Sequence, residues 1–461
     1  MKIHALNTVN IQWIYKIGDE KMNESAKLVG VGTKGLRFLQ LIFVDINGVP
    51  KGMEVPIGRY EEAVEDGIPF DGSSIPGFQG IEDSDLIFKA DPSTYAEVPW
   101  EGIARVYGYI YKDEKPYWAD PRGILKKTLE KLEKEGFKAY IGPEPEFYLF
   151  KKNGTWELHL PDSGGYFDIV TLDKARELRR EIALYMPSFG LVPEVLHHEV
   201  GRAQHEIDFR YDEALRTADN VVSFKYIVKS IAEMRGFHAT FMPKPLYGFP
   251  GNGMHLHISL WKGGENAFIG EEGLSETALH FMAGILKHAK ALTALTNPTV
   301  NSYKRLVPGY EAPVYISWGY RNRSALIRIP AFRGNGARIE YRCPDPSANP
   351  YLAFSAILMA GLDGIKRKLE PEAYVETNVY EMSEEDREKL GIETLPGSLG
   401  EALEELKKDK VVKTALGDAY QNFMKYKEAE WEAYTEYLES KGLPEDTKNV
   451  TEWELERYFY V

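Results

Sequence analysis

The sequence predicts an α+β protein, with a small β-rich N-terminal domain and a larger α/β domain whose curved antiparallel sheet surrounds a polar cavity. Three observations lead to this fold class. Two alternating apolar runs around Asn47-Gly48 form a hairpin signal near the N-terminus. Beyond residue 120, short predicted strands alternate with helices. Four of those strands carry ionisable side chains on one face and apolar side chains on the other.

The composition is that of a soluble globular protein. The chain has 461 residues, 43% of them hydrophobic, which is enough for two domains with a large core. The net charge of -14 argues against nucleic acid or an anionic membrane as a partner. The one cysteine, Cys343, excludes an intrachain disulfide and a cysteine-based zinc cluster. No apolar run approaches the ~20 residues of a membrane span, and no secretory signal opens the sequence. We therefore expect a cytoplasmic protein.

The β-rich domain is expected over residues 31–120. Residues 1–30 have no clear period and are expected to form an N-terminal extension of unclear role. The hairpin over 37–56 is followed by the polar loop FDGSSIPGFQGIEDSD and by the strand VYGYIY at 106–111. A G-x-G-x-x-G match at 30–35 precedes a strand rather than the helix that would hold a pyrophosphate, so we do not interpret it as a nucleotide loop.

The larger domain is expected over residues 121–461. Its first helix has Asp120 as N-cap and Pro121 at the first position, and it stops before Gly136. Further helices are expected over 219–235 and, as a buried core helix, over 352–365. The helical spacing of residues 396–461 predicts a packed helical segment with a solvated face.

The segment GPEPEFYLF, residues 142–150, places Glu144 and Glu146 on one face of a predicted strand. Carboxylates roughly 6–7 Å apart on one face repel each other unless a cation lies between them. Pro145 leaves a second interpretation open, because proline also suits an edge strand with a solvated face.

The same alternation recurs in three further strands. Their polar faces are His255, His257 and Ser259 in GMHLHISLW, Glu206, Asp208 and Arg210 in QHEIDFR, and Arg338, Glu340 and Arg342 in ARIEYRC. One such strand usually has a solvated face, but four of them predict a sheet curled around a polar active site. Carboxylates with one imidazole suit Mg²⁺ or Mn²⁺ better than structural zinc, and nearby arginines suit phosphate. This combination is typical of phosphoryl transfer.

Several motifs, in order from about residue 37 to the C-terminus, resemble those of type I glutamine synthetase. They are DGSS (71–74), GPEPEFYLF (142–150), HHEVGRAQHEID (197–208), GNGMHLHISL (251–260), KRLVPGYEAP (304–313), and RNRSALIRIP through RIEYRCPDPSANPYLAF (321–354). The resemblance implies a small β-grasp domain and a large catalytic domain with a funnel-shaped active site. It also implies ATP-dependent joining of ammonia to glutamate through γ-glutamyl phosphate, in a homododecamer of two hexameric rings with active sites between subunits.

The resemblance further implies two or more Mg²⁺ or Mn²⁺ ions and a set of site residues. The metal ligands would be Glu146, Glu199 and Glu206 for one ion and Glu144, His255 and Glu340 for the other. The ATP contacts would be Glu194, Tyr211, His257, Ser259, Arg323, Arg328 and Arg338. The glutamate contacts would be Gly251, Asn252, Arg305, Glu311 and Arg342. The catalytic residues would be Asp71, Glu311 and Arg323, with Asp71 binding ammonium across the subunit boundary.

Two other functions stay open. A relative that joins glutamate to a larger amine, such as a γ-glutamylpolyamine synthetase, would share most motifs, although Asp71 and Glu311 favour ammonia. A non-catalytic structural relative would be expected to have lost metal ligands, and all six are present. Gly80 replaces an arginine that some members use for feedback control, and Asn335 replaces a basic residue that often follows the RIP segment.

Overall fold

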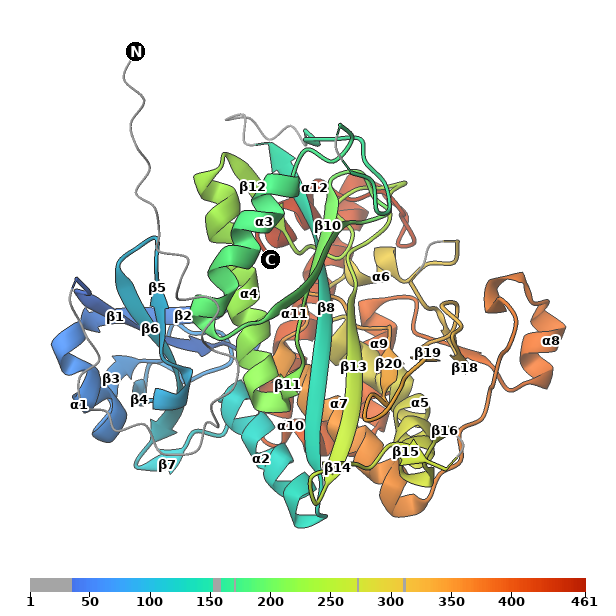
Figure 1. The fold of residues 1–461 in the computed structure, drawn as a ribbon, viewed down its shortest axis with the longest axis horizontal. Helices are drawn as coiled ribbons and strands as arrows, with labels where there is room; N and C mark the ends of the chain where they lie inside the picture. The colour runs from blue at the N-terminus through green and yellow to red at the C-terminus, as the bar shows by residue number, and fades with distance from the viewer. Residues whose placement is uncertain (1–34, 152–158, 170, 272, 310–311) are drawn as a thin grey trace.

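The structure, a computed structural model, describes residues 35–151, 159–169, 171–271, 273–309 and 312–461. Within these residues a smaller N-terminal sheet lies on one side of α4 and a larger sheet on the other (Figure 1). The expected extension at 1–30 and most of the G-x-G-x-x-G match lie outside the described residues.

The N-terminal domain is a β-grasp whose sheet has the order β2-β1-β6-β4-β3. Its elements are β1 (Phe38–Val44), β2 (Pro50–Pro56), α1 (Tyr60–Glu65), β3 (Ile68–Asp71), β4 (Asp85–Ala90), β5 (Ala96–Val98), β6 (Ile103–Lys112) and β7 (Lys115–Pro116). The predicted hairpin is confirmed as β1–β2: Gly48 has a φ of 84°, and Asp45 Oδ1 accepts a hydrogen bond from the Asn47 amide at 2.9 Å. β1 also pairs in parallel with β6, at the centre of the sheet.

The larger domain is built on a ten-stranded curled sheet with the main order β18-β19-β20-β13-β8-β10-β9. These strands are β8 (Lys138–Lys151), β9 (Pro193–His198), β10 (Gln204–Phe209), β13 (Met254–Lys262), β18 (Trp318–Tyr320), β19 (Ile327–Ile329) and β20 (Ile339–Tyr341). β11 (Asp212–Glu213), β12 (Phe237–Thr240) and β14 (Glu265–Asn266) extend it, while β15 (Ile269–Gly270) with β16 (Gly273–Leu274) and β17 (Tyr315–Ile316) with β21 (Glu393–Thr394) form two small ribbons. The pairing is antiparallel, as expected, except between β18 and β19.

The alternative of an edge strand at GPEPEFYLF is wrong, because β8 lies between β13 and β10. The prolines are tolerated for a local reason. β11 pairs with β8 only at Tyr140 and Ile141, and β10 only from Glu146 onward. Pro143 and Pro145 fall in the gap, where the missing N–H groups face no partner strand.

Helices cover the back of the sheet and form the C-terminal region. They are α2 (Pro121–Lys134), α3 (Arg176–Tyr185), α4 (Ala214–Met234), α5 (Glu276–Thr296), α6 (Ser302–Arg305), α7 (Pro350–Arg367), α8 (Glu384–Lys389), α9 (Leu399–Lys408), α10 (Lys410–Leu416), α11 (Ala419–Lys441) and α12 (Glu452–Tyr458). Gly284 allows α5 and α7 to pack closely, because a Cβ at this position would come 2.1 Å from the Ala360 carbonyl oxygen. In the described part of the chain, no helix has the length and apolarity to cross a membrane.

The helix expected over 219–235 differs from α4, which begins earlier, at Ala214. Asp219 is buried within the helix, where its carboxylate accepts hydrogen bonds from Arg122 at 2.9 Å and from the Tyr351 hydroxyl at 2.7 Å. These tertiary partners satisfy an aspartate that sequence alone would place at a helix start. The helix after Asp120, the buried helix around 352–365 and the helical C-terminal segment are confirmed.

Candidate active site

Cross-strand pairing gathers the ionisable residues of the four predicted strands on one face of the sheet. Residues directly opposite each other in antiparallel strands have Cβ atoms about 4.5–5.5 Å apart. Three opposed pairs form the centre of the face: Glu144 with His255, Glu146 with Glu206, and His257 with Glu340. The alternation seen in each strand therefore becomes one cluster.

Glu340 is 2% exposed and lies between two guanidinium groups. Its Oε1 accepts a hydrogen bond from Arg342 Nη1 at 2.7 Å, and its Oε2 accepts one from Arg328. Burial alone would raise the pKa of Glu340, but the charges of Arg342 and His257 lower it to about 2. The carboxylate is therefore ionised at neutral pH.

A chain of hydrogen bonds joins Arg338, His257 and Glu144. Arg338 Nε donates to His257 Nδ1 at 3.1 Å, and His257 Nε2 lies 2.7 Å from Glu144 Oε1. Burial opposes ionisation of Glu144, but His257 and His255 hold its pKa well below the usual range. His255 Nδ1 lies 3.4 Å from Glu144 Oε2, and burial together with Arg342 lowers its pKa to about 4. A neutral imidazole and an ionised carboxylate are the forms that bind a metal.

Glu146 and Glu206 form a like-charge pair that the surrounding protein does not fully compensate. Burial and the charge of Glu199 raise the pKa of Glu146 to about 8, although Arg305 acts against this. Burial and Asp208 raise the pKa of Glu206 well above its usual range. A divalent cation bound between these carboxylates would relieve both the desolvation and the repulsion. The predicted ligands therefore fit Mg²⁺ or Mn²⁺.

Two residues near these carboxylates were missed by sequence reasoning. Gln204 Nε2 donates to Glu146 Oε2 at 2.8 Å and thereby orients that carboxylate. His197 lies 3.4 Å from Glu199 Oε1 and 3.8 Å from Glu206 Oε1. The alternation itself could have identified Gln204, since it precedes Glu206 by two positions and shares its face.

A cavity of about 300 Å³ opens beside Glu144. Most of the residues predicted to contact ATP line it, namely Glu194, Tyr211, His257, Ser259 and Arg338. Asn335, at the position where relatives often carry a basic residue, also lines it. Arg328 and Arg323 do not line it: Arg328 binds Glu340, and Arg323 forms a hydrogen bond with Tyr166.

A much smaller space of about 30 Å³ lies beside Glu146 and is lined by Gly251 and Arg305. A Cβ on Gly251 would come 2.6 Å from a neighbouring carbonyl oxygen and 2.7 Å from Arg305 Cγ, so a larger residue would close the space. Arg305 is held by the Cys343 carbonyl oxygen, to which its Nη1 donates at 2.7 Å. The Asn252 side chain is fully buried and donates to a backbone carbonyl at 2.9 Å, so it supports the loop.

The structure of one chain does not bring the three predicted catalytic residues together. Asp71 is exposed at the end of β3, and its Oδ1 accepts a hydrogen bond from the Ser73 amide at 2.8 Å. It lines neither of the two cavities described above. Glu311 lies outside the described residues. Arg323 is in the loop between β18 and β19.

A further buried cluster, Asp162, His198 and His205, does not suit a metal ion. His198 Nε2 lies 3.1 Å from Asp162 Oδ1. Arg179 Nη1 donates to His205 Nδ1 at 2.8 Å, which places the proton of a neutral His205 on Nε2. That nitrogen has no lone pair to offer, so the cluster lacks a third ligand.

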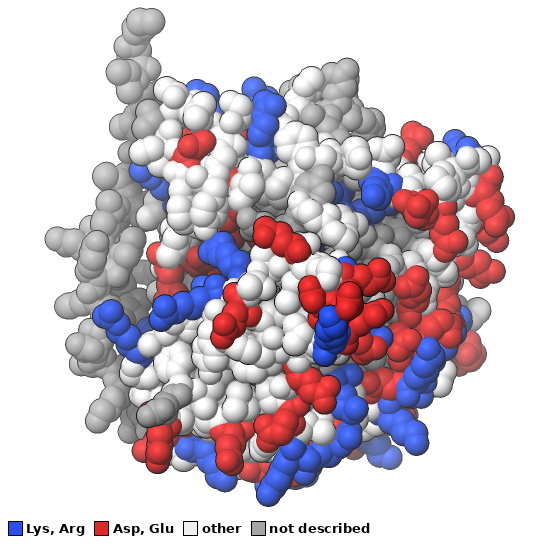
Figure 2. Space-filling view, turned by 90° about the vertical axis from the view of Figure 1, so that its right-hand side faces the viewer, with Lys and Arg blue, Asp and Glu red and all other residues white. Residues whose placement is uncertain are grey.

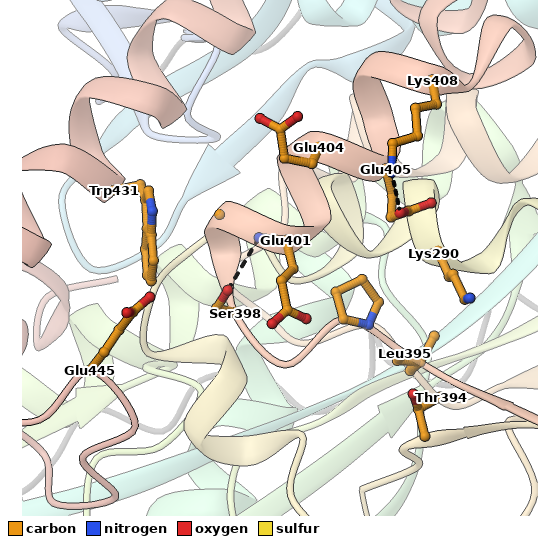
Figure 3. A pocket seen from close by; sticks show the side chains of 12 residues that line it. Lys290, Thr394, Leu395, Ser398, Glu401, Glu404, Glu405, Lys408, Trp431 and Glu445 are labelled. Atoms are coloured by element: carbon orange, nitrogen blue, oxygen red, sulfur yellow. Dashed lines mark hydrogen bonds and ion pairs between the residues drawn. The ribbon is translucent and has the colours of Figure 1, made fainter.

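A separate groove beside α9 holds none of the predicted site residues (Figure 3). Glu401, Glu404 and Glu405 project along it, and Lys408 forms an ion pair with Glu405 at 2.8 Å. The face of the molecule in Figure 2 likewise shows acidic side chains gathered on one side, with Lys and Arg among them. Both features reflect the acidic composition of the chain, and neither contributes a residue to the cluster of metal-ligand candidates on the curled sheet.

Comparisons with known proteins cover almost all of the described chain. Residues 35–113 match the protein-family model "Glutamine synthetase, beta-Grasp domain", and residues 118–458 match "Glutamine synthetase, catalytic domain". A glutamine synthetase of Thermococcus kodakarensis is 81% identical over 425 residues, covering 92% of this chain and 96% of the relative. One from Pyrococcus furiosus is 79% identical, covering 95% and 100%, and one from Thermotoga maritima is 52% identical, covering 93% and 97%. The solved structure "GmaS/ADP complex-Conformation 1" has a TM-score of 0.82 and 35% identity, covering 92% and 96%.

Proposed function

The chain belongs to the glutamine synthetase family, and we propose that it uses ATP to join ammonia to L-glutamate. The products are L-glutamine, ADP and phosphate, and the reaction passes through γ-glutamyl phosphate. The observation that carries this proposal is the cluster of six metal-ligand candidates beside a cavity lined by most of the predicted ATP contacts.

Two divalent cations, Mg²⁺ or Mn²⁺, would be held by the clustered residues. Glu146, Glu199 and Glu206 would hold one ion, and Glu144, His255 and Glu340 the other. When bound, such cations supply positive charge to phosphoryl oxygens. The raised pKa values of Glu146 and Glu206 support this proposal. They follow from burial and from neighbouring carboxylates, and a bound cation would offset both effects.

The chain's own side chains position ATP and glutamate. Tyr211, which is 49% exposed and lines the larger cavity, offers an aromatic face to the adenine. We assign Glu194, His257, Ser259, Arg328 and Arg338 to the nucleotide and its phosphates, and Arg323 to the phosphoryl group in transfer. Planar guanidinium groups suit this charge because they donate paired hydrogen bonds to phosphate oxygens. Gly251, Asn252, Arg305, Glu311 and Arg342 would form the glutamate pocket.

Ammonium must lose a proton before it can act as a nucleophile. We assign this step to Asp71, whose hydrogen bond with Ser73 lowers its pKa and keeps the carboxylate ionised. The ammonia formed in this way attacks the acyl carbon, the C–O bond to phosphate breaks, and phosphate leaves with that electron pair. The nitrogen then loses its extra proton to the departing phosphate or to water, which leaves the amide. Glu311, together with Asp71, would form the small pocket that holds the ammonium ion.

Asp71 would come from a neighbouring subunit. Its exposed position on the β-grasp domain, outside both cavities of its own chain, supports active sites formed between subunits. Such sites fit the proposed homododecamer of two hexameric rings. We also propose that the enzyme acts in the cytoplasm, in nitrogen metabolism.

The choice of ammonia over a larger amine is tested by product analysis. Purified enzyme is given ATP, glutamate and Mg²⁺ with ammonium, methylamine or a polyamine, and the products are identified by mass spectrometry. We expect ADP and glutamine with ammonium and at most a small fraction of that rate with either amine. Faster turnover with an amine would favour a γ-glutamyl-amine synthetase, and no ADP with any nucleophile would favour a structural role.

A further inference from the structure

A cavity of about 510 Å³ lies between the β-grasp domain and the catalytic domain, separate from the active site. Its walls come from β1, β2 and β6, from α4, and from the C-terminal residues 457–461. α4, which lines the cavity, lies between the two sheets in Figure 1. It is lined by none of the residues that we assign to substrates or metals.

The lining carries more positive than negative charge. Its cations are Lys51, Arg105, Lys225, Lys229, Lys427 and Arg457. Glu430 is the acidic side chain that lines it, and this carboxylate is already engaged. Its Oε2 accepts a hydrogen bond from Lys427 at 2.9 Å, and its Oε1 accepts one from the Tyr458 hydroxyl at 2.5 Å. Lys51 is also compensated, because its Nζ lies 3.4 Å from Asp45 Oδ2, and Asp345 partly offsets the charge of Lys225. Arg105 and Lys229 have no carboxylate partner among the described residues that line the cavity.

Arg105 is 2% exposed, yet its Nε and Nη1 have no hydrogen-bond partner among the residues that the structure describes. Its Nη2 donates to the Tyr107 hydroxyl at 3.2 Å. The ring centre of Tyr226 lies 4.3 Å from the guanidinium carbon. This aromatic ring stabilises the positive charge, but it offers no lone pair to the two remaining N–H groups. Buried N–H donors without an acceptor are unfavourable. The guanidinium group of Arg105 therefore has two N–H donors that a bound ligand could satisfy.

Lys225 and Lys229 lie one helical turn apart on α4 and line the same cavity. Their amines donate to the backbone carbonyl oxygens of Pro346, at 2.7 Å, and Tyr460, at 2.8 Å. Within the described ranges, neither amine forms an ion pair with a carboxylate. Burial lowers the pKa of Lys225 to about 8, and burial together with Lys225 lowers the pKa of Lys229 to about 7. Carbonyl oxygens satisfy the hydrogen bonds of these amines but cannot neutralise their charges.

We propose that this cavity binds a small dianion, a phosphate group or a dicarboxylate, held by Arg105, Lys225 and Lys229. The anion would accept the unpartnered N–H groups of Arg105 and compensate the two neighbouring lysines. Because β6 and α4 belong to different domains, the bound anion would also bridge them. The site would thus respond to an anionic metabolite independently of catalysis.

Isothermal titration calorimetry on the full chain tests this proposal. The active site is first saturated with Mg²⁺, a non-hydrolysable ATP analogue and glutamate, so that neither phosphate nor succinate can bind there. Inorganic phosphate and succinate are then titrated separately at constant ionic strength. Binding of one probe and not the other identifies the class of anion.

The decisive variant is Lys225→Met/Lys229→Met, which removes both charges while keeping apolar side chains of similar length. We expect it to bind the preferred probe at least about tenfold more weakly, because two charge-assisted contacts are lost. Lys127→Met/Lys131→Met is the matched control, since both lysines are exposed one turn apart on α2. It should bind like the wild type. The single Lys229→Met variant gives a smaller loss in the same direction if the double variant does not fold.

Two results would overturn the proposal. One is the absence of heat from either probe at millimolar concentrations with the saturated wild-type enzyme. The other is equal affinity in the wild type and in the α4 variants, which would place the anion elsewhere. Either result leaves the proposed ligase activity untouched, because the lysines lie outside the active site.

Discussion

At the scale of single residues, Asp71 distinguishes ammonia activation from a purely structural turn. Its carboxylate already bonds the Ser73 amide, and asparagine can keep that bond while losing charge and basicity. We expect Asp71→Asn to slow glutamine formation from ammonium by roughly 10²-fold or more, the usual scale for a positioned base. Hydroxylamine, which is neutral and nucleophilic at pH 7, should be affected much less. Both rates are measured at saturating ATP and glutamate, and equal slowing of the two would assign the loop a structural role.

Glu340 provides a second test at this scale, of the metal assignment. Removing the whole side chain would leave Arg328 and Arg342 facing each other without their shared carboxylate. Glu340→Gln keeps an oxygen acceptor and the volume but removes the charge. We expect the rate of phosphate release to fall by about 10²-fold or more, because losing this anionic ligand removes several kcal/mol of transition-state stabilisation. A normal circular dichroism spectrum with normal turnover would refute the assignment.

At the scale of elements, His288 joins three helices. On α5, its Nδ1 lies 2.6 Å from Asp409 Oδ2, at the N-cap of α10, and its Nε2 lies 3.1 Å from Asp363 Oδ2 on α7. Burial alone would lower the pKa of His288, but the bond with Asp409 raises it. A raised pKa in the folded state adds stability below the unfolded value of about 6.5, and this gain is lost as pH rises through the folded pKa. The pKa of Asp409 is lowered in the folded state, so its carboxylate adds stability at pH values above its unfolded pKa of about 3.9.

We therefore expect His288→Gln to lower the melting temperature clearly at pH 6 and much less at pH 9. The charged hydrogen bonds lost at pH 6 contribute about 1.5–3 kcal/mol. Calorimetric scans at both pH values measure the effect. Repeating them in an Asp409→Asn background, which keeps the helix cap, should shrink the pH dependence. A difference that is the same at both pH values would exclude a charged imidazole.

At the scale of the whole molecule, shared active sites predict complementation between two inactive variants. If Asp71 serves the neighbouring subunit, a ring that mixes Asp71→Asn with Glu340→Gln contains some sites with both native residues. Random mixing leaves about a quarter of the sites intact, because each heterologous interface draws its two halves independently. Co-expressed, differently tagged variants should therefore recover roughly that fraction of activity. Hybrids no more active than the parents would place Asp71 in the site of its own chain, or in none.

The sequence by itself determined the features that depend on neighbouring residues. Asn47-Gly48 formed the predicted turn because glycine tolerates a positive φ, and Asp120 with Pro121 started α2 as expected. The alternation around Glu144 predicted a polar face because side chains in any strand alternate with a period of two. These properties are local, so the hairpin, the first long helix and the polar strand faces could be predicted without coordinates. The set of metal-ligand candidates, which includes Glu199 outside those strand faces, depended on the family motifs.

Tertiary structure alone decided which distant segments meet. The register that sets Glu144 opposite His255 joins strands more than a hundred residues apart, and no local pattern encodes that pairing. The position of Gln204 against Glu146 follows from the same pairing. The cationic cavity has no sequence signal at all, because Arg105 and Lys225 come from different domains and meet only when their elements pack. Local geometry fixes the direction of each side chain, whereas the free energy of packing selects its partners.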